Sequence, residues 1–241
     1  MNIGVYITLL NDEYLIPYSF AAIHKFFPEV KVLDFGSEDS SCNRIPKKSL
    51  IRCGKQNPKD YITLKNEFSS KHDQVFWIDA DEIYPESSLR KISALLGTNR
   101  ERVVGEWRSV IVEPDKTIWI EKPFIRGVVA WKTDTNRLYR DWPGEHLKHI
   151  DPNWRESKKW RKDHIWCWHG VLLNRSSTRE HTGRFKKRLQ RLQESETRDT
   201  KQKINDRGRK RNYRMRGTWS RYDWIPWGDD NVLKYVPTRH E

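Results

Sequence analysis

Asp79 and Asp81, two carboxylates that follow an apolar run, are the residues of this chain best suited to chemistry. The run is Val75–Ile78, and Glu82 comes directly after Asp81. Such a run is typical of a buried strand that ends at a polar edge, and open α/β sheets bind ligands where parallel strands end. Asp79 and Asp81 would leave that edge as neighbouring oxygen donors, which Mg²⁺ and Mn²⁺ prefer. A strand that ends in a solvated acidic turn explains the pattern equally well.

The first hundred residues predict the elements that would position these acids. We expect strands at residues 3–10, 30–35 and 75–78 and helices at residues 12–27, 61–70 and 88–96. Asn11 and Asp12 are expected to cap the first helix, Pro28 to end it, and Ser87 and Ser88 to cap the third. Alternating strands and helices indicate an α/β domain with a mainly parallel sheet flanked by helices.

Beyond residue 100 the pattern changes. Strands are expected at residues 103–112 and 117–121 around the turn residues 113–116, and a further strand at residues 128–132. Residues 180–216 have a helical pattern with little apolar face. We therefore expect a domain at residues 1–180 and a basic, Trp-containing C-terminal extension at residues 181–241.

The positive charge is concentrated in that extension. The chain of 241 residues has a net charge of +13, and residues 184–221 alone hold 15 Lys/Arg against 4 Asp/Glu. The rest of the chain is therefore almost neutral. A concentrated basic segment is typical of proteins that contact polyanions, and a solvated helix face is the alternative.

Composition excludes several classes of protein. No apolar stretch reaches the length of a membrane span. The opening residues MNIGVYITLL lack a basic region and a small-residue cleavage site, so we expect a strand there and not a signal peptide. The three cysteines, Cys42, Cys53 and Cys167, are an odd number without CxxC spacing. A disulfide framework or a zinc site is therefore not expected, and a reducing cytoplasm fits.

Four blocks of sequence, in order, are similar to a known family of enzymes. They are residues 7–15 (ITLLNDEYL), 32–40 (VLDFGSEDS), 78–82 (IDADE) and 137–146 (RLYRDWPGEH). The first three resemble a strand that ends in an Asn-Glu pair, a "VDxGSxDxS" strand and loop, and a DxD metal motif. Through them the chain resembles nucleotide-sugar glycosyltransferases of the GT-A fold, nearest the large family 2 group. The resemblance covers roughly residues 3–170 and favours the metal interpretation of the acids.

The resemblance implies a divalent ion and a nucleotide-sugar donor, most readily a UDP-sugar. Asp81 would bind Mn²⁺ or Mg²⁺ directly, and Asp79 would bind through water or lie near the ribose. A late histidine often completes such a site, and His169 is the candidate, with His164 second. A histidine among aromatic residues is also common in a core, so the alternative stays open.

Further residues are implied to contact the donor. Asp34 would meet the nucleoside, although an aspartate before Gly36 can equally cap a turn. The backbone at Thr8 and Leu9 would line the base pocket. Lys65 would approach the phosphates or lie on a solvated helix face, and Arg175 and Arg179 could pair with diphosphate oxygens. The full set that we assign to the donor is Thr8, Leu9, Asn11, Glu13, Asp34, Lys65, Asp79 and Arg175.

Transfer with inversion needs a base that removes the proton of the acceptor hydroxyl. Glu145 and His146 are the candidates, because Trp142, Pro143 and Gly144 before them suggest a positioned loop. The fourth block resembles the acceptor side of lipopolysaccharide-core-type members, whose block ends His-Glu where this chain reads Glu-His. That departure leaves open which residue is the base, and a structural role for both stays open.

The acceptor has several candidates. Arginines and lysines among aromatic residues in 184–221 suit a phosphate backbone, as a bacteriophage transferase acting on hydroxymethylated DNA bases would need. A basic face can instead hold an enzyme on anionic lipid, beside a lipid-linked or lipopolysaccharide acceptor. A non-catalytic nucleic-acid-binding protein on a transferase scaffold is the alternative from another class. The late Trp/Asp cluster at residues 224–230 either packs on the domain or offers a second acid pair.

Overall fold

The computed structural model describes residues 1–112, 118–122, 125–141, 144–150, 163–173 and 223–226. The chain divides into two compact units. The first comprises Met1–Trp107, Ile125–Arg140 and His146–His169, and the second comprises Arg108–Phe124, Asp141–Glu145 and Gly170–Glu241. The basic segment 184–221 lies outside the described residues, and of the extension at 181–241 the structure describes only residues 223–226.

The first unit is built on a mixed sheet. Its strands are β3 (Leu50–Arg52), β2 (Lys31–Asp34), β1 (Ile3–Leu9), β4 (Gln74–Asp79), β8 (Ile125–Lys132) and β6 (Arg102–Val112), in that spatial order. The ladders among β3, β2, β1 and β4 are parallel, whereas β8 joins β4 and β6 in antiparallel ladders. The expected α/β class with a sheet flanked by helices is therefore confirmed.

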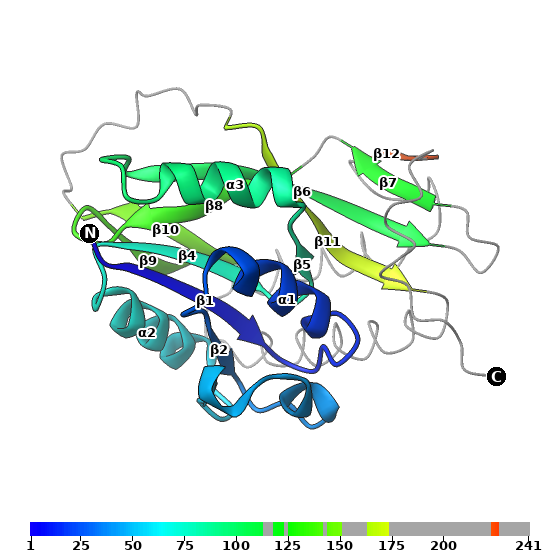
Figure 1. Cartoon of the computed structure of the whole chain (residues 1–241), viewed down its shortest axis with the longest axis horizontal. Coiled ribbons are helices and arrows are strands. Elements are labelled where there is room, and N and C mark those ends of the chain that lie inside the picture. The colour runs from blue at the N-terminus through cyan, green and yellow to red at the C-terminus, as the bar shows by residue number, and fades with distance from the viewer. Residues whose placement is uncertain (113–117, 123–124, 142–143, 151–162, 174–222, 227–241) are drawn as a thin grey trace. The chain divides into compact units, whose positions relative to one another are not determined.

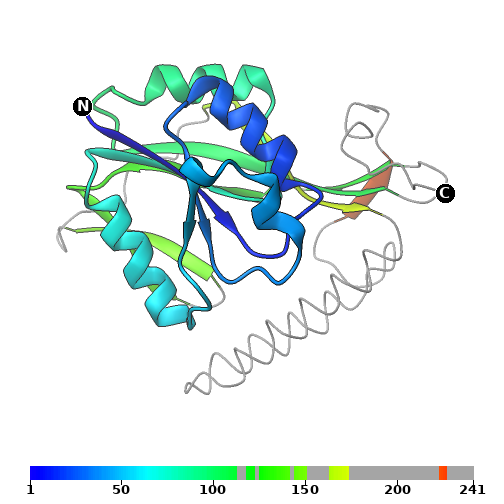
Figure 2. The ribbon, with the colours of Figure 1, turned by 60° about the horizontal axis from the view of Figure 1, so that its bottom comes forward.

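Three helices cover the two faces of this sheet. α1 (Ile16–Phe26) and α3 (Glu86–Leu95) lie on one face, and α2 (Pro58–Ser69) lies on the other (Figures 1 and 2). Parallel strands are joined by crossover connections, which run from the carboxyl end of one strand back to the amino end of the next. The helices in these connections cover the faces of the sheet.

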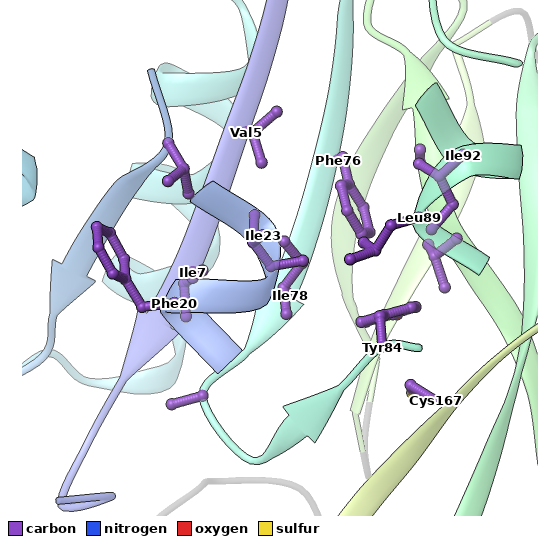
Figure 3. Close-up of a cluster of buried hydrophobic side chains, with 14 of the residues drawn as sticks. Val5, Ile7, Phe20, Ile23, Phe76, Ile78, Tyr84, Leu89, Ile92 and Cys167 are labelled. Atoms are coloured by element: carbon purple, nitrogen blue, oxygen red, sulfur yellow. The ribbon is translucent and has the colours of Figure 1, made fainter. Parts of the chain in front are cut away.

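Two hydrophobic clusters hold the helices to the sheet. On the α1 and α3 face, Ile7 and Phe76 of the sheet pack with Ile23 and Ile92 of the helices (Figure 3). On the α2 face, Trp77 packs with Tyr6, Leu33 and Ile62. Strands buried on both faces read as continuous apolar runs, which is why Val75–Ile78 shows no alternation. Burial of each large aliphatic side chain contributes about 1.5–3 kcal/mol.

The expected helix caps are wrong. α1 begins at Ile16 without a side-chain cap and with proline in its first turn. Asn11 instead adopts a left-handed conformation with φ of 55°. α3 begins at Glu86 after Pro85, and Ser88 lies inside the helix. The expected helix ends are confirmed: α1 stops at Phe26, shortly before Pro28, and α3 stops at Leu95.

Several elements of the first unit were not expected. The short 3₁₀ helices Ser40–Arg44 and Lys47–Ser49 follow β2. The unexpected strands are β3, β5 (Glu82–Ile83), β9 (Asn136–Asp141), β10 (Gly144–His149) and β11 (Ile165–Leu173). β5 pairs antiparallel with β11, and β9 and β10 form a separate two-stranded sheet. Most of these strands are short or carry polar side chains at intervals, so their sequences lack a clear apolar run.

The described part of the second unit is a small antiparallel ladder. The end of β6 pairs with β7 (Ile118–Lys122), which confirms the two strands expected there, while the turn at residues 113–116 lies outside the described residues. β12 (Asp223–Pro226) pairs with β7 through Trp224 and Glu121. The beginning of the Trp/Asp cluster therefore packs back on the chain as a strand.

Candidate functional site at the carboxyl ends of the parallel strands

The register of the parallel strands brings the predicted donor residues to one edge. Thr8 of β1 lies opposite Asp79 of β4, and Leu9 lies opposite Asp34 of β2. Backbone bonds extend the pairing past the strand ends, since Ala80 N donates to Thr8 O at 2.9 Å. Three strands thus end together, and each delivers an acid or a hydroxyl at the same edge (Figure 1).

Thr8 contributes its side chain and not only its backbone. Its hydroxyl oxygen Oγ1 is hydrogen-bonded to Asp79 Oδ1 and lies 3.3 Å from the Ile78 carbonyl. Thr8 is 8% exposed, whereas Asp79 is exposed. The contact therefore fixes the orientation of a carboxylate that would otherwise be free to rotate in solvent.

Asp34 is a buried carboxylate that caps the turn after β2. It is 4% exposed, and its Oδ1 accepts the Ser37 backbone N–H at 2.9 Å. Burial raises the pKa of the Cys42 thiol, and the charge of Asp34 raises it further. The turn-capping alternative is therefore confirmed, and contact with a nucleoside remains a prediction for the carboxylate's remaining acceptor positions.

Asn11 and Glu13 join two loops at this edge. The Asn11 side-chain oxygen accepts Glu38 N at 2.7 Å, and the Asn11 N–H donates to Ser37 Oγ at 3.0 Å. Glu13 accepts Ser40 N at 3.1 Å through Oε2. These residues thus have a structural function that the sequence did not predict: they tie the loop after β1 to the loop after β2.

Lys65 is buried against aromatic rings. It is 4% exposed, so the solvated-face alternative is wrong. Its Nζ lies 4.5 Å from the centre of the Trp77 ring and 3.4 Å from the Tyr61 hydroxyl. Trp77 precedes Asp79 by two residues, hence Lys65 lies on the side of β4 from which Asp79 projects.

The neighbouring Asn66 holds β9 to α2. Its amide accepts from Leu138 N and donates to Leu138 O, both at 2.9 Å. The side chain thereby takes the place of a neighbouring strand for one residue. β9 leads into β10, which contains Glu145 and His146, while the placement of these two side chains lies outside what the structure describes.

β5 and β11 place a histidine beside the acids. Glu82 pairs with His169 and Ile83 with Trp168, which brings His169 to the segment that carries Asp79 and Asp81. His164 lies just before the first residue of β11 and is exposed, and its carbonyl accepts Lys91 Nζ at 3.1 Å. Arg175 and Arg179 lie outside the described residues.

Glu82 is a buried acid for which the sequence suggested no role. It is 5% exposed; it accepts the Trp107 indole N–H through Oε1 and the Tyr84 hydroxyl through Oε2. Burial raises the pKa of Glu82 well above its usual range, and the carboxylates of Asp79 and Asp81 raise it further. Tyr84 and Cys167 belong to the buried cluster of Figure 3, and burial likewise raises the pKa of each.

The donor set at this edge suits a hard divalent cation that also binds substrate. Among the described residues, no group of three His, Cys, Asp or Glu side chains is arranged to hold a metal ion. Asp79 and Asp81 offer two carboxylates. Mg²⁺ is commonly held by one or two carboxylates together with substrate phosphates and water, so two acids fit such an ion.

Comparisons with known proteins yield partial likenesses. No protein-family model matches the chain, and no curated protein matches its sequence. One similar solved structure is glucosyl-3-phosphoglycerate synthase from Mycobacterium tuberculosis with Mn²⁺ and uridine-diphosphate-glucose, at 20% identity over 45% of this chain and 43% of that one, with a TM-score of 0.36. Another is S. aureus TarS 1–349, at 18% identity over 46% and 36%, with a TM-score of 0.35.

The chain spans less than half the length of these solved structures. Likenesses of this extent do not show an activity for this chain. The candidate site is defined by the positions of the chain's own residues. In the described part of the chain, no helix has both the length and the apolar character to cross a membrane.

Proposed function

We propose that this protein is a metal-dependent glycosyltransferase of the GT-A type, which moves a sugar from a nucleoside-diphosphate donor to an acceptor hydroxyl. The observation that carries the proposal is the shared strand edge, where β1, β2 and β4 end together with Asp34 and Asp79 on the strands that flank Thr8 and Leu9, and Asp81 follows two residues after Asp79. Strand ends of this kind are where α/β sheets bind nucleotides. The sequence blocks assign a UDP-sugar as the donor.

Each acid has a separate task in this proposal. Asp79 and Asp81 would hold Mn²⁺ or Mg²⁺, which when bound supplies Lewis-acid stabilisation of the departing diphosphate. Asp34, fixed by Ser37 N and buried, orients the nucleoside by accepting a hydrogen bond. His169 joins the set through its pairing with Glu82.

The acceptor side is assigned from the sequence. Glu145 or His146 would take the proton of the acceptor hydroxyl, whose oxygen would displace the diphosphate from the opposite face of the anomeric carbon and so invert it. The charge of residues 184–221 favours a polyanionic acceptor. DNA with hydroxymethylated bases is the first candidate acceptor, and an anionic glycolipid is the second. Both are candidates because arginine and lysine side chains can bind the phosphates of either.

A hydrolysis assay tests the donor half of the proposal. UDP-glucose and other UDP-sugars are incubated with the protein, with and without Mn²⁺, and release of UDP is measured alongside UDP binding by calorimetry. Metal-dependent release supports the enzyme. Absence of both release and binding would leave the non-catalytic nucleic-acid-binding alternative.

A transfer assay then separates the acceptors. Labelled sugar is offered with DNA that contains hydroxymethylcytosine, with unmodified DNA, and with an anionic lipid extract. Label on the modified DNA alone supports the first candidate, and label on lipid supports the second. If the protein does not bind DNA at physiological salt, the DNA proposal fails.

A further inference from the structure

We propose that Trp107 and Glu82 form a clamp that fixes the turn bearing Asp79 and Asp81, and that both are positioning residues for the metal site. The inference rests on the proposed function, since it concerns the same acids. Trp107 and Glu82 are not members of the acid pair, but their contacts set the geometry of that pair.

Trp107 reaches Glu82 across 25 positions of sequence. Its indole N–H donates to Glu82 Oε1, and its ring lies directly over Gly127 of β8. A Cβ atom at position 127 would overlap with that ring. Gly127 therefore leaves room for the outer ring atoms of the indole, whose N–H donates to Glu82.

Glu82 is held by backbone and side-chain contacts together. Its second carboxyl oxygen accepts the Tyr84 hydroxyl at 3.0 Å, and its carbonyl accepts Ser19 Oγ at 3.0 Å. Its backbone pairs with His169 in the β5 and β11 ladder. The residue that follows Asp81 is therefore anchored to α1, β6 and β11 at once.

The other end of the turn is anchored as well. Asp79 pairs with Thr8, whose carbonyl also accepts Ala80 N at 2.9 Å. Between these anchors, the Asp81 carboxylate makes no hydrogen bond or ion pair within the described residues. A carboxylate that is uncommitted while its backbone is fixed is suited to accept a ligand without reorganisation.

The physical reason for a clamp is the shortness of β5. Its two residues, Glu82 and Ile83, form too short a ladder to hold a turn rigid. A single hydrogen bond contributes little net stability, because folding exchanges it for bonds to water, so several are needed. Outer partners that orient a metal site typically change metal affinity by about 10–100-fold when they are removed.

The test measures Mn²⁺ affinity in the presence of UDP by electron paramagnetic resonance, which does not depend on turnover. Trp107→Phe removes the donor to Glu82 together with the outer ring atoms that lie against Gly127. Trp131→Phe is the matched control, because Trp131 is buried and its indole nitrogen has no hydrogen-bond partner within the described residues. We expect Trp107→Phe to weaken Mn²⁺ binding about tenfold and the control to leave it within about twofold of the wild type.

Substitutions of Glu82 provide the second arm. Glu82→Ala should weaken Mn²⁺ binding as much as Trp107→Phe, while Glu82→Gln keeps an acceptor for the indole and should restore most of the affinity. Thermal unfolding of each variant reports general destabilisation. Equal Mn²⁺ affinity in Trp107→Phe and Trp131→Phe would overturn the clamp. If the wild type takes up no Mn²⁺ with UDP, the proposed function itself fails and the clamp with it.

Discussion

Thr8 and Asp79 are in-register partners on neighbouring parallel strands, and the threonine hydroxyl is hydrogen-bonded to the carboxylate. The bond joins a buried hydroxyl to an exposed acid at the carboxyl edge of the sheet. It shows how the sheet itself, and not a loop, sets the direction of the Asp79 carboxylate.

Replacement of the Thr8 hydroxyl should weaken donor binding. In Thr8→Val the Asp79 carboxylate loses its partner and gains rotational freedom, so we expect KM for the UDP-sugar to rise several-fold and stability to fall by about 1 kcal/mol. Thr8→Ser retains the hydroxyl and is the control. Steady-state hydrolysis and thermal unfolding measure both effects. An unchanged KM in Thr8→Val would show that the bond does not position the acid.

Loss of Asp81 should abolish metal-dependent turnover and leave the fold intact. Asp81 is partly exposed, so Asp81→Ala removes a ligand without opening the core. We expect a loss of at least about 100-fold in metal-dependent hydrolysis, at the upper end of the effect of disturbing a metal site. Asp134→Ala, at an exposed acid beside Lys132, is the control. Activity retained in Asp81→Ala would refute the ligand assignment.

Asn66 should matter more for transfer than for donor hydrolysis. Asn66→Ala removes both hydrogen bonds to Leu138 and leaves two backbone groups of β9 without them. We expect a loss of stability of about 1–3 kcal/mol and a fall in sugar transfer, because β9 leads into the strand of Glu145 and His146. The exposed neighbour Glu67→Ala is the control. Donor hydrolysis and sugar transfer are measured in parallel for each variant. An equal fall in both rates for Asn66→Ala would contradict a larger effect on transfer.

The fold should lose stability in mild acid through His72. The Tyr6 hydroxyl lies 2.6 Å from His72 Nε2, and Asn2 Oδ1 lies 3.0 Å from Nδ1. A neutral ring with its proton on Nδ1 satisfies both contacts, because burial raises the pKa of Tyr6 and keeps its hydroxyl a donor. Burial lowers the pKa of His72 below 6.5, Lys71 lowers it further, and Asp73 opposes both.

The sign of that pH dependence follows from linkage. Because the folded state binds the His72 proton less readily than the unfolded chain, the contribution of the neutral ring is fully present above pH 6.5. It is lost as pH falls from there through the lower folded value. Denaturant unfolding at pH 7.5 and 5.5 should show a smaller loss in His72→Gln than in the wild type, with His24→Gln as control. An equal loss in all three proteins would contradict the assignment.

Much of the site could be predicted from local patterns. The apolar run before Asp79 predicted a buried strand, and the family resemblance implied that Asp34 belongs to the same site; the register sets Asp34 and Asp79 on the strands either side of β1. The hydrogen bond of the Thr8 side chain to Asp79 was not predicted. The caps predicted at Asn11 and Ser88 were wrong, because contacts with other segments satisfy these side chains: Asn11 accepts Glu38 N, and Ser88 Oγ accepts Trp166 N.

The sequence by itself therefore determined the parallel strands, the helices between them and the acids at the strand ends. These features follow from residue types within a few positions of one another. Only the tertiary structure decided that Trp107 holds Glu82, that Asn66 holds Leu138 and that His169 pairs beside the acids. Partners separated by 25 to 87 positions leave no local periodicity, because packing of the finished sheet brings them together.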